Sequence, residues 1–287
     1  MNKLYVRYKS FSNRMRDSLS YAWILIGSIS TVLSIFGVSL GDIPILNIWS
    51  SIGLVFLAAT IAFASIYFFL GQIFKDAVEL TIRNTPVSIC FGDIFKTSGW
   101  KIINCDTHFD SRVDDTVISK ISLHGQLFLK YGNEIKTVVE DEGEKLHLHK
   151  NKNELYDFPL GTIIKYDCKK ENQIYLLLAM TELNEQYEAH IDMAKFEHML
   201  MRMWKEISRV YVSNDVVLPL LGSGITRFDD GPKGNDELLR CMLCTLNSSG
   251  VTLNAKVKVV LYNDLNKNSI GNDIQLYEYK DMFRKIN

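Results

Sequence analysis

Two long runs of apolar residues occupy the N-terminal quarter of the chain. Asp42 is the only Asp, Glu, Lys or Arg between Asp17 and Lys75, although such residues make up 23% of the sequence. The segment Gly41–Pro44 divides this region into runs of about 19–40 and 48–74. Each run supplies the roughly 20 apolar residues that a spanning helix needs, and a hydrocarbon core requires backbone hydrogen bonds made within the segment. The pattern predicts a transmembrane helical hairpin.

A cleaved signal peptide and the buried hairpin of a soluble protein are the alternatives. The second run, at least as long as the first, argues against both, because removal of a signal would leave it unexplained. Five basic residues precede the first run, whereas the connection between the runs carries only Asp42. Because positive residues stay on the cytoplasmic side, we expect both termini in the cytoplasm. The expected division is a basic N-terminus (1–18), a membrane hairpin (19–74) and a cytosolic domain (75–287).

After the hairpin, short β-branched runs alternate with helical patterns, which is typical of an α/β fold. The clearest helix is predicted over His190–Tyr211, where Phe196, Leu200, Met203 and Ile207 recur near the helical period. A helix is also expected to begin near Asp236. We predict strands at Val87–Phe91, Lys101–Asn104, Gln126–Lys130, Gly161–Lys165, Gln173–Ala179, Val216–Leu221 and Lys256–Tyr262.

Two further segments of the cytosolic domain are predicted to be a helical link and a surface hairpin. Lys75–Arg83 is expected to be a helical link between the hairpin and the domain. Glu134–Glu154 is charged and turn-rich, and we expect a surface hairpin there. His147 and His149 alternate within this segment as strand neighbours do, but nothing beside them completes a metal site. We predict no metal in this protein.

Charge and cysteine content exclude other classes of function. Outside the first 74 residues, 27 basic residues face 31 acidic ones, a net charge of −4. A nucleic-acid partner is not expected, because a phosphate backbone is normally bound by a basic face. The cysteines lie in a region that the topology places in the cytosol, so disulfides are not expected. Cys241 and Cys244 form a CxxC without a second pair, and we interpret them as packed thiols.

The segment VVLPLLGSGITRF, residues 216–228, is the first that suggests chemistry. A buried apolar strand runs directly into Gly222, Ser223 and Gly224. Glycines at the carboxyl end of such a strand allow backbone N–H groups to approach an anion, and ligands of open α/β sheets bind beyond these strand ends. Ser223 and Thr226 can add hydroxyl donors. A diphosphate is the expected anion, although for GSG alone a plain turn is the better interpretation.

The neighbouring motifs strengthen this interpretation. VSICF followed by GDI (residues 92–94), then KIINCD (101–106), SLHG (122–125), PLLGSGI (219–225) and KVVLY (258–262) occur in the order and at the spacings of the macro domain. The resemblance covers nearly all of residues 86–264. It implies a three-layer α/β/α domain with a mixed sheet and a site for an ADP-ribose derivative, without a further cofactor.

The resemblance also implies roles for individual residues. Asp93, with Ile94 beside it, corresponds to the aspartate that binds the adenine amino group, and Asn104 to the asparagine beside the distal ribose. Asp106, Thr107 and His108 fall where the distal group of the ligand would lie. Tyr262 is placed to flank the adenine. The two loops implied to hold the diphosphate contribute Ser122, Leu123, His124 and Gly125 in the first, and Leu221, Gly222, Ser223, Gly224, Ile225 and Thr226 in the second.

One departure from the family bears on catalysis. Hydrolytic macro domains carry NAAN followed by a glycine-rich run, whereas this chain has NCDTHFDSRVDDTVISKISLHG from Asn104 to Gly125. The second asparagine and the glycine run are both missing, so the means of holding a catalytic water is in doubt. We therefore expect binding without catalytic residues, and a membrane-anchored ADP-ribosyl hydrolase is the alternative. For His108, a role in selecting the ligand and a solvent-exposed loop position both remain open. For His124, the loop position is better supported than a role of the side chain.

A two-span anchor joined to a macro domain of this kind resembles the membrane effectors of type II Thoeris anti-phage systems. The resemblance implies a multi-pass protein of the bacterial inner membrane. It also implies a functional partner, a TIR-domain enzyme that consumes NAD and makes an ADP-ribose derivative, reported as a histidine conjugate. The macro domain would sense this signal, assemble into a homo-oligomer and allow the helices to damage the lipid bilayer.

Overall fold

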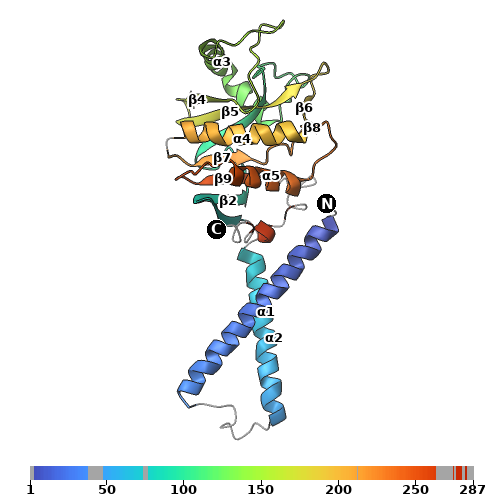
Figure 1. Ribbon diagram of the computed structural model, residues 1–287, viewed down its shortest axis with the longest axis vertical. Coiled ribbons are helices and arrows are strands. Elements are labelled where there is room, and N and C mark those ends of the chain that lie inside the picture. Colours follow the sequence, from blue (N-terminus) through green and yellow to red (C-terminus); the bar gives the residue numbers. More distant parts are fainter. Residues whose placement is uncertain are drawn as a thin grey trace. The chain divides into compact units, whose positions relative to one another are not determined.

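The computed structural model describes residues 3–37, 48–73, 77–211, 213–262, 274, 276–279 and 282. Two compact units are present. The first contains the helices α1 (Lys3–Ile35) and α2 (Ile48–Ile73) together with a short 3₁₀ helix, η3 (Leu276–Tyr279). The second extends from Glu79 to Ile274 and carries the sheet (Figure 1).

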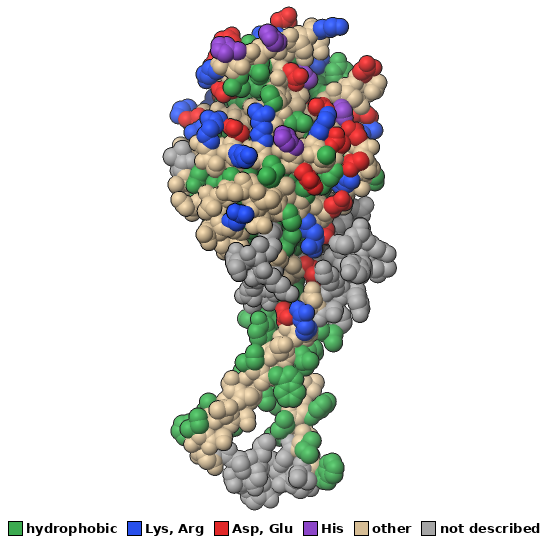
Figure 2. All heavy atoms as spheres, in the orientation of Figure 1, with side chains coloured by type: hydrophobic (Ala, Val, Ile, Leu, Met, Phe, Trp, Pro, Cys, Tyr) green, Lys and Arg blue, Asp and Glu red, His purple; other side chains and the backbone are tan. Residues whose placement is uncertain are grey.

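The two helices of the first unit are long and apolar enough to cross a membrane over Asn13–Ile35 and Ile52–Gln72. Their surfaces carry many exposed large apolar side chains, including Trp23, Trp49 and Phe56. Figure 2 shows green hydrophobic side chains along these helices and a dense mixture of blue and red charged ones over the sheet-containing unit. α1 also continues through the basic segment that precedes the expected span.

The second unit is built on a mixed sheet. The described strands follow the order β1-β2-β9-β7-β3-β5-β6-β8, with β4 beside β5. From β2 to β5 all neighbours are parallel, whereas β4 and β6 run antiparallel to β5. The strands are β1 (Ala77–Ile82), β2 (Thr85–Phe91), β3 (Trp100–Asp106), β4 (Ile163–Cys168), β5 (Gln173–Leu183), β6 (Ala189–Ile191), β7 (Val216–Pro219), β8 (Arg227–Phe228) and β9 (Val257–Leu261).

Helices cover both faces of this sheet. α3 (Leu123–Lys145) packs on one face, where Leu127, Ile135 and Val139 join strand residues such as Ile103 in a buried cluster. α4 (Met193–Val210) and α5 (Asn235–Ser248) lie across the other face (Figure 1). They are joined by a hydrogen bond from the Trp204 indole to the Thr245 hydroxyl, 3.1 Å long. The predicted α/β fold with a mixed sheet is confirmed.

The expected helical link at Lys75–Arg83 is wrong for the part that is described. Residues 77–82 form the strand β1, in which Val78 and Ile82 are buried. Arg83 and Asn84 both have positive φ, as in the tight turns that join neighbouring strands. In AVELTI the apolar residues alternate with the period of two that is typical of a strand. The segment is only 6 residues long and is flanked by charged residues, which concealed this pattern in the sequence.

The predicted strand Gln126–Lys130 and most of the predicted hairpin Glu134–Glu154 are also wrong, because α3 occupies residues 123–145. Its buried residues Leu127, Phe128, Tyr131, Ile135 and Val139 follow helical spacing. Tyr131 has non-helical backbone angles (φ −133°, ψ 15°) and marks a kink. The kink and the charged outer face concealed the helical period from the sequence pattern.

The five cysteines are free. Cys241 and Cys244 both lie on α5, where Cys241 is half-buried and Cys244 is exposed. The expectation that both thiols are packed is therefore wrong for Cys244. Burial raises the pKa of the Cys241 thiol to about 12, so this side chain stays protonated at neutral pH.

Candidate functional site

The candidate residues gather at one edge of the sheet because four neighbouring strands are parallel. β2, β9, β7 and β3 lie side by side in this order, so their carboxyl ends meet at the same edge. Asp93 follows β2, Tyr262 follows β9, the GSG turn follows β7, and Asp106 ends β3. Residues that are far apart in the sequence therefore form one row.

Asp93 begins the row in the turn after β2. Its Oδ1 accepts a hydrogen bond from the backbone N–H of Phe95 at 2.9 Å, and Oδ2 lies 3.6 Å from the Lys96 ammonium. The side chain is 37% exposed, so a carboxylate oxygen is accessible to a ligand. Ile94 is buried in the core cluster and does not face solvent. Tyr262, by contrast, is 61% exposed.

The turn after β7 has room for an anion. Gly222 has φ +82°, and a Cβ at this position would lie 3.1 Å from Phe228. Gly224 is exposed, and a Cβ there would have no heavy atom within 4 Å. The Ser223 hydroxyl donates a hydrogen bond to the Leu220 carbonyl at 2.6 Å. The hydroxyl proton of Ser223 is therefore engaged within the turn. Leu221 is buried, Thr226 is half-buried, and Ile225 is 62% exposed.

The SLHG motif begins the helix α3. Ser122 is the N-cap, and its hydroxyl accepts a hydrogen bond from the Gly125 N–H at 2.9 Å. A Cβ on Gly125 would lie 2.1 Å from the Ser119 carbonyl oxygen, so only glycine permits this close approach. The expectation that this motif is a loop is wrong for Leu123, His124 and Gly125, which form the first helical turn. A helix N-terminus presents backbone N–H groups and favours anions.

His124 connects this helical turn to the end of β3. Its Nδ1 lies 3.8 Å from Oδ2 of Asp106, and its ring packs edge-on against Phe128. The ring is buried, and Nε2 has no hydrogen-bond partner among the described residues. Burial lowers the pKa of His124 below its ordinary value, despite the opposing charges of Asp106 and Asp110. The imidazole is therefore neutral at pH 7.

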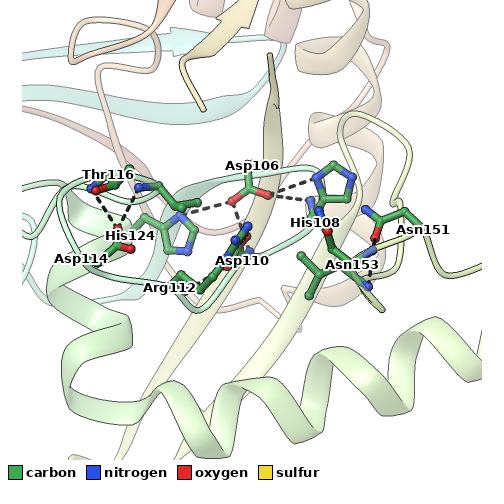
Figure 3. Close-up of polar contacts among 11 residues, drawn as sticks. Asp106, His108, Asp110, Arg112, Asp114, Thr116, His124, Asn151 and Asn153 are labelled. Carbon is green, nitrogen blue, oxygen red and sulfur yellow. Dashed lines mark hydrogen bonds and ion pairs between the residues drawn. The ribbon is translucent and has the colours of Figure 1, made fainter. Parts of the chain in front are cut away.

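Asp106 organises the loop that follows β3. Its Oδ1 accepts from the His108 N–H at 2.7 Å and its Oδ2 from the Asp110 N–H at 3.2 Å. Figure 3 shows its carboxylate between the rings of His124 and His108. The side chain is only 2% exposed. Asp106 therefore positions the loop by accepting backbone hydrogen bonds.

The remaining candidates at this end of the row differ in accessibility. Thr107 is buried, and its backbone N–H donates to the Thr181 carbonyl at 2.9 Å. The His108 ring is 23% exposed and lies between two carboxylates, 3.7 Å from Asp106 and 3.8 Å from Asp157. Asn104 is half-buried on β3.

Three residues that the sequence interpretation did not single out, Asp110, Arg112 and Asp114, stabilise the same loop. Arg112 Nη2 lies 2.6 Å from Asp110 Oδ2, and its Nε donates to both carboxylate oxygens. Burial alone would raise the pKa of Asp110, but hydrogen bonds from Arg112 outweigh it and hold this pKa below its ordinary value. Asp114 accepts from the N–H groups of Thr116 and Val117. The recurrence of aspartates in DTHFDSRVDD was the available signal, since aspartate commonly accepts hydrogen bonds from residues two or three positions later.

Comparison with known proteins identifies the family of this chain. Residues 87–262, more than half of the chain, match the family model described as Thoeris protein ThsA, Macro domain. The chain belongs to this family. The ThsA macro domain thus contains every candidate residue of the row, from Asp93 to Tyr262.

A curated relative and several solved structures resemble the chain. The Thoeris protein ThsA of Bacillus amyloliquefaciens (strain Y2) is 28% identical over 227 residues, which cover 74% of this chain and 73% of the relative. The structure of an Oceanobacillus iheyensis macrodomain with ADP has a TM-score of 0.47 at 16% identity and covers 73% of this chain and 97% of its own. A mutant of that macrodomain with ADPR has a TM-score of 0.43 at 15% identity and covers 74% of this chain and 100% of its own.

Proposed function

We propose that this protein is a membrane-anchored sensor of a Thoeris defence system and that its macro domain binds an ADP-ribose derivative. The order of the groups along the sheet edge supports this proposal. Asp93 and Tyr262 come first, the glycine turn after β7 is next, and Asp106, at the end of β3, is last. An ADP-ribose molecule has the same order: adenine, diphosphate and distal ribose.

Each part of the row suits one part of this ligand. The accessible carboxylate of Asp93 would accept a hydrogen bond from the adenine amino group, while the exposed ring of Tyr262 would stack on the base. The open backbone at Gly224 and the N-terminus of α3 would hold the diphosphate. Asn104 and His108 would contact the distal ribose and the group attached to it.

The arrangement favours binding over hydrolysis. A general base needs a carboxylate oxygen that can reach a water molecule, but both oxygens of Asp106 already accept backbone hydrogen bonds in a buried position. The neutral ring of His124 is buried as well. Hydrolysis of ADP-ribosylated substrates is the competing outcome that a test must address.

The two apolar helices would convert binding of the signal into disruption of the membrane. We infer that residues 1–18 are cytoplasmic, 19–74 anchor the protein as a hairpin in the inner membrane, and 75–287 form the cytosolic sensor. The partner would be a TIR-domain enzyme that converts NAD into the signal, with a histidine conjugate of ADP-ribose as the proposed form. Binding would favour a homo-oligomer whose helices disrupt the bilayer. A near-complete switch between two states requires about 5.5 kcal/mol of differential binding.

The test uses the full-length protein in liposomes that contain a fluorescent dye. ADP-ribose and its histidine conjugate are added separately, while calorimetry measures binding and light scattering measures assembly. We expect the conjugate to bind, to enlarge the assembly and to release dye. Asp93→Ala should reduce all three responses together.

Two results would contradict this proposal. Tight binding without assembly or dye release would leave a sensor without the proposed output. Release of product from ADP-ribosylated substrates at rates typical of enzymes, about 1 per second or faster, would favour the hydrolase if Asn104→Ala abolished it.

A further inference from the structure

The C-terminal 3₁₀ helix η3 makes specific polar contacts with α1. The Tyr277 hydroxyl donates a hydrogen bond to Asp17 Oδ2 at 2.7 Å. The Asn13 side-chain amide donates to both carboxylate oxygens of Glu278, at 3.2 Å each. Asn13 and Asp17 are four residues apart, so they lie on the same face of α1. We call Asn13, Asp17, Tyr277 and Glu278 the clasp.

The same turn of α1 is held against α2. The Arg14 guanidinium lies 3.8 Å from the centre of the Tyr67 ring, a cation–π contact. A Cβ on Gly71 would lie 2.5 Å from Arg14 Nη1, so glycine allows this close approach. Ser18 is fully buried. The stretch of α1 from Asn13 to Asp17 therefore contacts both α2 and η3.

The clasp matters because of how the chain connects the two units. α2 ends at Ile73 and β1 begins at Ala77, so a short covalent link joins α2 to the sensor. α1 has no such link, because it precedes α2 in the chain. Among the described residues, α1 is joined to the segment beyond β9 by the hydrogen bonds of the clasp.

The other end of this connection lies at the candidate site. Tyr262 directly follows β9 and is proposed to contact the ligand, and the same chain reaches η3 at Leu276. A ligand that repositions Tyr262 would act on the chain that carries Tyr277 and Glu278. Hydrogen bonds between side chains can break and re-form without unfolding either helix, which is what a reversible switch requires.

We propose that the clasp is an autoinhibitory contact, in which η3 holds α1 against α2 in the resting protein. Signal binding opens the clasp, and the helices then rearrange in the membrane. The link to the signal rests on the proposed function, whereas the holding role of η3 does not.

The proposal is tested by closing the clasp covalently in full-length protein. Asn13→Cys and Glu278→Cys are combined in a protein whose accessible Cys90, Cys241 and Cys244 are replaced by serine. A short bis-maleimide with a reducible disulfide spacer joins the two new thiols in dye-loaded liposomes. We expect the joined protein to bind the histidine conjugate of ADP-ribose more weakly, because it cannot open the clasp, and to release at least tenfold less dye at saturating conjugate. Reduction of the spacer should restore release. The single variants Asn13→Cys and Glu278→Cys, treated in the same way, are the matched controls.

Opening the clasp should have the opposite effect. Tyr277→Phe removes the hydroxyl that bonds Asp17 and leaves the ring in place. We expect dye release without any signal to rise several-fold above the unmodified protein, with a Kd for ADP-ribose no higher than that of the unmodified protein as evidence of an intact fold. Signal-driven release from the joined protein equal to that of the single variants would overturn the proposal, as would a Tyr277→Phe protein that leaks only with signal.

Failure of the proposed function gives a different result. In that case the unmodified protein would release no dye with the conjugate. The clasp is then judged by the yield of cross-linking in liposomes without signal. A high yield that Asp17→Ala and Tyr277→Phe reduce several-fold would support the holding role of η3, and a yield that neither change affects would refute it.

Discussion

Nδ1 of His124, in the first turn of α3, lies 3.8 Å from Oδ2 of Asp106 at the end of β3. This pair connects the helix N-terminus proposed to hold the diphosphate with the loop proposed to face the distal group. Both side chains are buried, and Asp106 also accepts two backbone hydrogen bonds. The two parts of the candidate site therefore lie next to each other in the folded domain.

The buried His124 should make the stability of the protein sensitive to mild acid. Its pKa in the folded protein lies below the ordinary value of 6.5 because of burial, so below pH 6.5 the unfolded chain binds a proton that the folded chain does not. Stability should therefore fall as the pH falls from 6.5 towards the folded pKa, by up to about 1.4 kcal/mol per pH unit. The melting temperature of the full-length protein in detergent, measured from pH 7.5 to 5.0, reports this loss.

His124→Gln should flatten this pH dependence, because glutamine does not titrate. His198→Gln is the control, since His198 is exposed on α4 and its replacement should leave the slope unchanged. Equal slopes for the unmodified protein and His124→Gln would show that His124 does not cause the acid sensitivity.

Asp93→Ala should weaken binding of the ligand. A hydrogen bond to a charged group contributes about 1.5 to 3 kcal/mol, which corresponds to roughly a tenfold or greater rise in Kd. Calorimetry with ADP-ribose measures the change. Asp167→Ala, on β4 away from the row, is the control. An unchanged Kd for Asp93→Ala in a folded protein would remove Asp93 from the site.

Gly224→Val should block binding without loss of stability. A Cβ at Gly224 meets no atom within 4 Å, and its φ is not positive, so valine fits the unliganded turn but occupies the space proposed for the diphosphate. Gly222 is unsuitable for this test, because φ +82° and the contact with Phe228 would strain any side chain. The expected result is at least a hundredfold rise in Kd with an unchanged melting temperature.

Gly132→Val on α3 is the matched control. A Cβ at Gly132 also meets no atom within 4 Å, and valine has a higher helix propensity than glycine. Normal binding by Gly224→Val would show that the turn after β7 does not hold the diphosphate.

The elements that were predicted correctly are those whose apolar residues form a distinct local pattern in the sequence. β2, β3, β7 and β9 are short apolar runs, and their parallel order explains how Asp93, the GSG turn and Asp106 come together. α3 was missed because its kink at Tyr131 interrupts the helical period. The clasp was also missed, because hydrogen bonds between Asn13 and Glu278 leave no pattern within a single sequence.

The roles of buried polar residues were equally hard to predict. The family resemblance placed Asp106 where the distal group of the ligand would lie. The structure shows that its oxygens accept the N–H groups of His108 and Asp110. A ligand contact and a residue that positions a loop can occupy the same place in the sequence. Only the direction and burial of the side chain in the structure distinguish these two roles.

Asp106→Ala should therefore lower stability as well as binding. Loss of the carboxylate leaves two backbone N–H groups without their acceptor, at a cost of about 1 to 3 kcal/mol each where they are buried. Asp93→Ala should cost less stability, since Asp93 is 37% exposed and Asp106 only 2%. Asp106→Asn keeps one acceptor oxygen and should recover part of the loss. Melting temperatures of the three full-length variants in detergent test this order.

Binding by Asp106→Ala should also depend on the ligand. ADP lacks the distal ribose, so its Kd should change little, whereas the Kd of the histidine conjugate should rise at least tenfold because the loop that faces the distal group is no longer held. Calorimetry with both ligands on the same protein separates this local effect from general destabilisation. If the Kd values of ADP and of the conjugate rise by the same factor, Asp106 does not act at the distal end of the site.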